Sequence, residues 1–235
     1  AVGTGLLVAF SDDGTAIHST LDRIEERAVL MKELSDFAID NFEGKFSNLL
    51  DETNGKLFNN GHGLYEILEK TGSFSDPLRK KSSFLAKLLY DSGLFNIVDR
   101  EHYIPIMDYH MQRVLLRLGC VKVLNHKLLS SLKNQEPLSS DTEVRNACVA
   151  AMNALIASSG IEPWRMNDIF WSLGRSCCNE TTLCTDKCCA KNPCTFQTIV
   201  MLYDHKNCSF ESTCRGALDA ETRKLWEPIV ETHYY

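Results

Sequence analysis

The residues with the clearest chemical potential are cysteines, which crowd into one short part of this 235-residue chain. Eight of the ten cysteines fall between positions 177 and 214, whereas Cys120 and Cys148 lie in apolar helical patterns that predict buried side chains. Disulfide frameworks are typical of small secreted chains, and this chain is long enough to build its own core. The clustering therefore favours a metal held by thiolates, and a location inside the cell, in the cytoplasm or nucleus.

Three kinds of chemistry can use such a group of thiols. Four thiolates bind a [4Fe–4S] cluster, thiolates with or without histidine bind zinc, and paired thiols form disulfides. We expect a [4Fe–4S] cluster, with zinc as the alternative cofactor. Eight cysteines exceed the four ligands of one centre, so a second zinc site or local disulfides could use the surplus, with His205 as a candidate partner.

The elements that must position these groups are predicted to be helices. Apolar residues recur at helical spacing, and no segment alternates with the period of two that marks a strand. Caps and breakers divide the pattern into helices over residues 17–42, 64–68, 77–89, 108–119, 139–160 and 166–174. Pro77 suits a first helical turn, with Asp76 as its cap. The sequence thus predicts an all-α protein.

Charge is distributed unevenly along the chain. The net charge of −6 argues against a protein that coats nucleic acid non-specifically. Residues 77–133, however, hold 10 Lys and Arg against 4 Asp and Glu, between two acidic flanks. This basic segment is either a solvated helix face or a surface that meets phosphates. No apolar run approaches the ~20 residues of a membrane-spanning helix, and the apolar residues 1–10 predict a first structural segment rather than a signal peptide.

Two motifs carry further information: PIMDYHMQRVLLRLG at residues 105–119 and WSLGRSCC at residues 171–178. Together they resemble the helix-hairpin-helix DNA glycosylase superfamily, which includes endonuclease III and the archaeal 8-oxoguanine glycosylases. In that family a Pro-x-x-Asp segment opens a helix that bears an arginine and ends in Leu-Gly, and a later helix ends in Gly-Arg-x-x-Cys. The matching residues here are Pro105, Asp108, Arg113, Leu118, Gly119, Gly174, Arg175 and Cys178. The resemblance covers residues 64–214 and implies a two-lobed helical fold with a cysteine-rich metal-binding loop.

The resemblance also implies catalytic residues. Asp108 is either a helix cap alone or also a carboxylate that stabilises oxocarbenium-like charge or activates a nucleophile. Family members that nick the backbone use a lysine nucleophile upstream of the aspartate. Lys80 and Lys81 follow an Asp-Pro pair as in the archaeal enzymes, which favours Lys80, with Lys81 as the alternate. The competing interpretation is that both lysines are merely solvated.

One departure from the family concerns the hairpin before the lysine. The family places Leu-Pro-Gly-x-Gly there to hold a DNA phosphate, but residues 70–80 read KTGSFSDPLRK, with Gly72 alone. An enzyme related to this family that acts on a modified nucleoside, nucleotide or RNA needs fewer contacts with backbone phosphates. Queuosine-nucleotide glycosylases, which are similar to DNA glycosylases in fold, are a precedent.

The family also suggests a ligand set. Its last two cluster ligands are separated by five residues, as are Cys208 and Cys214, and also Cys188 and Cys194. The Gly-Arg-x-x-Cys motif selects Cys178 over Cys177. The expected ligands are Cys178, Cys194, Cys208 and Cys214, with Cys184 and Cys188 in reserve.

The sequence therefore predicts an N-glycosylase, with or without lyase activity, that removes a damaged or modified base from nucleic acid. The alternatives are a glycosidase acting on a modified nucleotide or RNA, and a helical module that binds nucleic acid or protein without chemistry. We expect a monomer with no membrane contact. The predicted parts are an N-terminal helical segment (1–63), a basic central lobe with the active-site helices (64–133) and a C-terminal lobe with the cysteine-rich loop (134–235).

Overall fold

The computed structural model describes residues 2–234 and is mostly helical, with no strand in that range. Pairing of the β type among these residues is limited to two isolated bridges, Pro137 with Ile229 and Cys178 with Thr182. The all-α prediction is confirmed. None of the described helices is both long and apolar enough to cross a membrane.

Internal contacts divide the chain into two compact units, residues 2–102 and residues 103–233. Each unit is described here by itself. The boundary after His102 differs from the predicted division at 63 and 133, which stays a prediction, as does the glycosylase-like arrangement of lobes.

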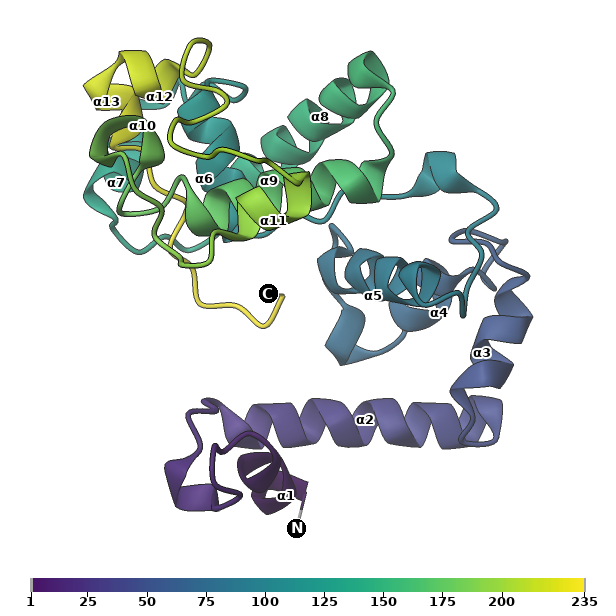
Figure 1. Cartoon of the computed structure of the whole chain (residues 1–235). Helices are drawn as coiled ribbons and strands as arrows, with labels where there is room; N and C mark the ends of the chain where they lie inside the picture. The colour runs from purple at the N-terminus through teal and green to yellow at the C-terminus, as the bar shows by residue number, and fades with distance from the viewer. Residues whose placement is uncertain (1, 235) are drawn as a thin grey trace. The chain divides into compact units, whose positions relative to one another are not determined.

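The first unit contains one long helix and several short ones (Figure 1). Its α-helices are α1 (Val2–Ala9), α2 (Ile24–Phe42), α3 (Phe46–Thr53), α4 (Leu64–Leu68) and α5 (Lys80–Asp91), and its 3-10 helices are η1 (Ala16–His18), η2 (Gly72–Phe74) and η3 (Arg100–His102). The side chain of Asp99 accepts hydrogen bonds from the backbone N–H groups of Leu57 and Phe58, at 2.8 and 3.1 Å. This buried carboxylate ties the loop before α4 to the end of the unit.

Two predicted helix starts in this unit are wrong. The long helix begins at Ile24 rather than at residue 17, because Asp13 accepts hydrogen bonds from Thr15 and forms a local turn that leaves Ile17 exposed. The helix expected from Pro77 begins instead at Lys80. The N-cap residue is Arg79 and not Asp76, whose carboxylate accepts from the backbone N–H of Lys80 at 2.9 Å across a turn that contains Pro77.

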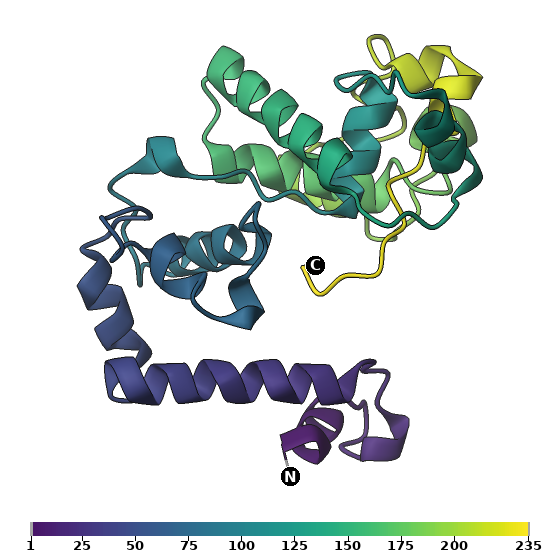
Figure 2. The same ribbon diagram turned by 180° about the vertical axis from the view of Figure 1, so that it is seen from behind.

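The second unit holds the functional motifs and is packed around α6 (Figure 2). Its helices are α6 (Tyr109–Leu118), α7 (His126–Asn134), α8 (Thr142–Ser159), α9 (Pro163–Ser176), α10 (Leu183–Asp186), α11 (Thr195–Val200), α12 (Arg215–Leu218) and α13 (Ala220–Arg223). Four apolar side chains of α6 are fully buried and Leu118 is partly buried, and the helix packs against α8 and α9. Asp108 and Gly119 bound this helix as the sequence predicts.

The two isolated cysteines have different outcomes. Cys148 is buried within α8, as predicted, and burial raises the pKa of its thiol to about 12. Cys120 was expected to be buried but is exposed. It follows Gly119, whose left-handed backbone (φ +85°) ends α6, so the apolar face of the helix does not extend to Cys120.

Candidate metal centre

Three cysteines and one histidine gather just after the end of α9. The Sγ atom of Cys177 lies 3.6 Å from that of Cys194, 3.9 Å from that of Cys189, and 3.1 Å from Nε2 of His205. All four ligand atoms lie within 4.8 Å of one another. We call these four residues the Cys177 centre.

The spacing suits one tetrahedral ion. Ligands about 2.3 Å from a tetrahedral zinc lie about 3.8 Å apart. The Cys177 sulfur lies at similar distances, 3.6 and 3.9 Å, from the sulfurs of Cys194 and Cys189. Three thiolates and one imidazole are also a ligand set that structural zinc sites use. The Cys177 centre could therefore hold a metal ion.

Ser176 brings the ligand loops to the end of α9. Its carbonyl accepts a hydrogen bond from the backbone N–H of Ala190 at 2.7 Å, and its hydroxyl accepts one from the N–H of Thr195 at 3.0 Å. Each of these partners directly follows a ligand, Cys189 or Cys194. Ser176 is completely buried, so these bonds are shielded from water and fix both loops against the helix.

Electrostatics indicate how the protonation of the Cys177 centre is linked to metal binding. Burial, and then the nearby thiols of Cys194 and Cys189, raise the pKa of the Cys177 thiol far above its usual range. Burial lowers the pKa of His205, which keeps its imidazole neutral and able to act as a ligand. Several thiolates can share this space only with a cation that offsets their charge, so metal binding must release protons.

The predicted ligands divide between two places. Cys194 belongs to the Cys177 centre, whereas Cys178, Cys184, Cys208 and Cys214 lie outside it and Cys188 is exposed. That the predicted residues together bind a single metal stays a prediction. The predicted set leaves out Cys177 and Cys189. Each stands in a Cys-Cys pair, and the pair itself is the signal that either member could be a ligand.

A buried arginine joins the two sequence motifs. Arg113 on α6 is 1% exposed and donates hydrogen bonds to the carbonyl of Gly174 at 3.0 Å and to that of Cys178 at 2.8 Å. It also forms an ion pair with Glu227 at 2.6 Å. The first motif is thereby fixed to the last turn of α9 and to the start of the cysteine-rich loop.

Close approach of α6 and α9 explains the glycine of the second motif. A Cβ atom at Gly174 would lie 2.6 Å from the carbonyl oxygen of His110, nearer than atoms can pack. His110 accepts a hydrogen bond from Arg113 through Nδ1 at 3.0 Å, since a guanidinium can only donate. Burial, and then the charges of Arg113, Arg175 and Lys191, lower the pKa of His110 to about 4.

Asp108 occupies the N-terminus of α6. It is 6% exposed, and its carboxylate accepts a hydrogen bond from the backbone N–H of Met111 at 3.0 Å. The segment before it is held by Asn167 on α9, whose amide bonds both the N–H and the carbonyl of Ile106. The carboxylate is therefore a helix cap, as both interpretations of Asp108 expect.

The two candidate lysines lie in the first unit, at the start of α5. Burial, and then the charges of Lys80 and Arg27, lower the pKa of Lys81. A lysine with a lowered pKa has a larger neutral, nucleophilic fraction, so the electrostatics are compatible with Lys81 as a nucleophile. Asp108 belongs to the other unit, and the shared cleft of lysine and aspartate stays a prediction.

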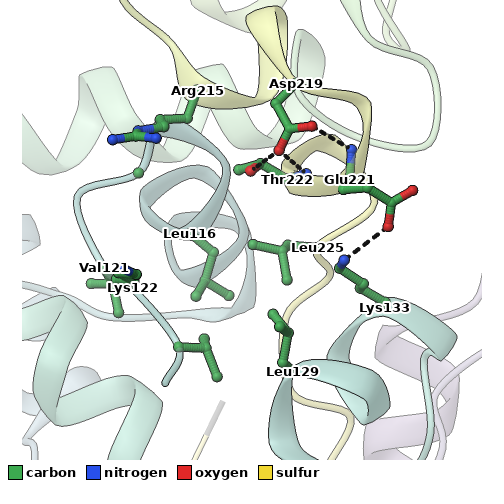
Figure 3. Close-up of a pocket in the computed structure, with 12 residues that line it drawn as sticks. Leu116, Val121, Lys122, Leu129, Lys133, Arg215, Asp219, Glu221, Thr222 and Leu225 are labelled. Atoms are coloured by element: carbon green, nitrogen blue, oxygen red, sulfur yellow. Dashed lines mark hydrogen bonds and ion pairs between the residues drawn. The ribbon is translucent and has the colours of Figure 1, made fainter. Parts of the chain in front are cut away.

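A separate pocket of about 280 Å³ opens near the end of α6 (Figure 3). Its floor is apolar and includes Leu116, Leu129 and Leu225. Lys133 and Glu221 form an ion pair across 2.9 Å in its wall, and further charged residues, Lys122 and Arg215, line it. None of the predicted catalytic residues or clustered cysteines lines this pocket.

Neither a protein-family model nor a curated protein matches this chain.

Proposed function

We propose that the chain is an N-glycosylase that removes a modified base from nucleic acid or from a nucleotide, with Asp108 as the catalytic carboxylate. The observation that supports this most is the contact between the two motifs. Arg113 of the first motif lies far in sequence from Gly174 and Cys178 of the second, and here it donates hydrogen bonds to the carbonyls of both. A chance match of two short motifs gives no reason for such bonding.

The proposed chemistry uses a carboxylate at a helix N-terminus. As the base departs with the electrons of the glycosidic bond, positive charge develops on the sugar, and the Asp108 carboxylate stabilises it. In the hydrolytic reaction water then adds to the sugar carbon, and its proton passes to the departed base. If a lysine takes the place of water, its neutral amine attacks the same carbon. The ring C–O bond then breaks, one amine proton passes to the ring oxygen and the other to the departed base, and a Schiff base is left. Lys81 or Lys80 fills this role.

The metal has a structural role in this proposal. The Cys177 centre would hold zinc, with a [4Fe–4S] cluster as the alternative cofactor of the chain, and would fix the loops that follow α9. Three thiolates and one imidazole complete a tetrahedral set and leave no open position for a substrate.

Base release tests the role of Asp108. We would incubate the protein with single-stranded and duplex oligonucleotides that carry uracil, 8-oxoguanine or alkylated bases, and with the matching free nucleotides. Asp108→Asn should lower base release by about 100-fold or more, while its melting temperature stays near that of the wild type because asparagine also caps helices. Asp108→Ala separates the roles, since it loses the cap as well. Equal activity of Asp108→Asn and the wild type would contradict the proposal.

Borohydride trapping tests the lysines. A Schiff base reduced in place leaves the protein covalently joined to the oligonucleotide. We expect Lys81→Ala to abolish the adduct and Lys80→Ala to keep it, so each variant controls for the other. Base release without any adduct indicates a hydrolase that needs neither lysine.

The pocket near the end of α6 supports a second candidate, a module that binds nucleic acid without chemistry. Lys122 and Arg215 line it beside an apolar floor, and Lys122 belongs to the basic segment. In that case oligonucleotides bind in a salt-dependent manner, Lys122→Glu weakens binding, and no base is released from any substrate.

A further inference from the structure

Four of the clustered cysteines remain outside the Cys177 centre and near one another. They are Cys178, Cys184, Cys208 and Cys214, which we call the Cys178 group. The sequence arranges them as two pairs, each with five residues between its members.

Arg117 on α6 brings the two pairs together. Its Nη1 atom lies 3.6 Å from the Sγ atom of Cys178, and the Sγ atom of Cys214 lies 3.4 Å from its carbonyl oxygen. Arg117 is 5% exposed, and its guanidinium donates to the carbonyls of Asn179 and Leu225, each at 2.8 Å. One buried residue thus contacts a sulfur from each pair.

Local folding places the second member of each pair beside the first. The bridge between Cys178 and Thr182 turns the chain back, and α10, which contains Cys184, begins at the next residue. In the other pair, the carbonyls of Cys208 and Phe210 accept from the N–H groups of Glu211 and Cys214, at 3.0 and 2.8 Å, which curls the loop. Phe210 packs against the core through Phe170, with ring centroids 6.3 Å apart.

The electrostatics of the thiols agree with this placement. Burial first, and then the nearby thiols of Cys184, Cys178 and Cys214, raise the pKa of Cys208 to about 11. The pKa of Cys214 is likewise raised, by burial first and then by Cys178 and Cys184. The thiols of one pair are therefore close enough to those of the other pair to raise their pKa values.

We propose that the Cys178 group is a second metal centre of four thiolates, separate from the Cys177 centre. The adjacent residues Cys177 and Cys178 then serve two different centres. Four thiolates suit a thiophilic metal, which is either a zinc ion or an iron–sulfur cluster. The N–H of Arg117 directed at a ligand sulfur offsets negative charge and orients the ligand, as outer partners of metal ligands commonly do.

The spacing of the Cys178 group favours the cluster. Among the described residues, the Cys177 centre is the one group of three or more Cys, His, Asp or Glu side chains whose ligand atoms all lie within 4.8 Å of one another. The sulfurs of the Cys178 group are more widely spaced, and a cluster of several irons spans a larger volume than one zinc ion.

Metal analysis of the full-length protein, purified without oxygen or chelator, tests the proposal. We expect one zinc ion with an iron–sulfur cluster and its visible absorbance, or two zinc ions, per chain. Cys208→Ser and Cys184→Ser should each lose the metal of the Cys178 group and keep one zinc. Cys189→Ser should lose that zinc instead, and Cys188→Ser, at an exposed position, should lose nothing. One metal ion per chain, with no change in Cys208→Ser, would overturn the proposal.

Alkylation of the wild-type protein tests whether the Cys178 group binds a metal, even if a variant fails to fold. Site-resolved mass spectrometry should find the four thiols of the Cys178 group protected until a chelator or acid releases the metal, and then labelled together. Cys120 and Cys188, both exposed, should be labelled from the start. Labelling of the Cys178 group that a chelator does not change, or cystines within it, would refute a second centre.

Discussion

At the scale of single residues, the neutral state of His110 links stability to pH. Its folded pKa of about 4 lies below the ordinary value of 6.5, because the ring is partly buried and lies near the positive charges of Arg113, Arg175 and Lys191. Between these values the unfolded chain binds a proton that the folded chain does not. The free energy of unfolding should therefore fall as the pH drops from 6.5 to 4.

His110→Gln isolates this effect, since glutamine keeps an acceptor for Arg113 but does not titrate. Because solvent screens a partly exposed ring, we expect the wild type to lose about 1–2 kcal/mol more than the variant over that range. Urea unfolding at several pH values measures it. The comparison cancels any acid-induced loss of metal, and parallel curves for the two proteins would count against a neutral, buried His110.

At this scale the sequence could predict a metal site but could not identify which cysteines form it. The crowding of thiols between positions 177 and 214 predicted a metal site, and such a cluster of ligands is present. In the Cys177–Cys178 pair, however, the direction of each side chain depends on how the backbone leaves α9. That direction is set by bonds from distant residues, such as the N–H of Ala190 to Ser176, which no spacing rule contains.

At the scale of helices, the contact of α6 and α9 depends on Gly174. Alanine there would place a methyl group against the backbone of His110, so one helix must shift. We expect Gly174→Ala to lower the free energy of unfolding by about 1–3 kcal/mol, the usual cost of overpacking. Gly5→Ala, in α1 with nothing within 4 Å of the new atom, is the matched control and should be neutral or stabilising. Equal behaviour of the two variants would refute the close contact.

Helix prediction succeeded where caps and periodicity agreed. Asp108 and Gly119 bound α6, and the sequence shows both signals directly. It failed at α2 and α5, where polar turns around Asp13 and Asp76 compete with the helix for backbone hydrogen bonds. Apolar spacing alone cannot reveal that competition.

At the scale of the whole molecule, metal removal should affect the two units differently. The Cys177 centre lies in the second unit, whereas the core of the first includes the buried hydrogen bond of Tyr65 with Ser83 at 2.7 Å. We expect a chelator to lower the free energy of unfolding of the second unit by at least ~3 kcal/mol. Hydrogen exchange measures this: protection should fall over residues 177–214 and persist in α4 and α5. Uniform loss across both units, or no loss, would contradict it.

Arg113 and Arg117 lie one turn apart on α6, and the ring of Trp226 lies against both guanidinium groups, 4.6 and 5.1 Å from ring centroid to Cζ. The flanking residues Leu225 and Glu227 supply a carbonyl to one arginine and a carboxylate to the other. Cleavage or truncation ahead of Leu225 would leave two cations inside the unit without these partners, at a cost of several kcal/mol. Proteolytic removal of this short segment would therefore destabilise the second unit, although the segment itself lies near the end of that unit.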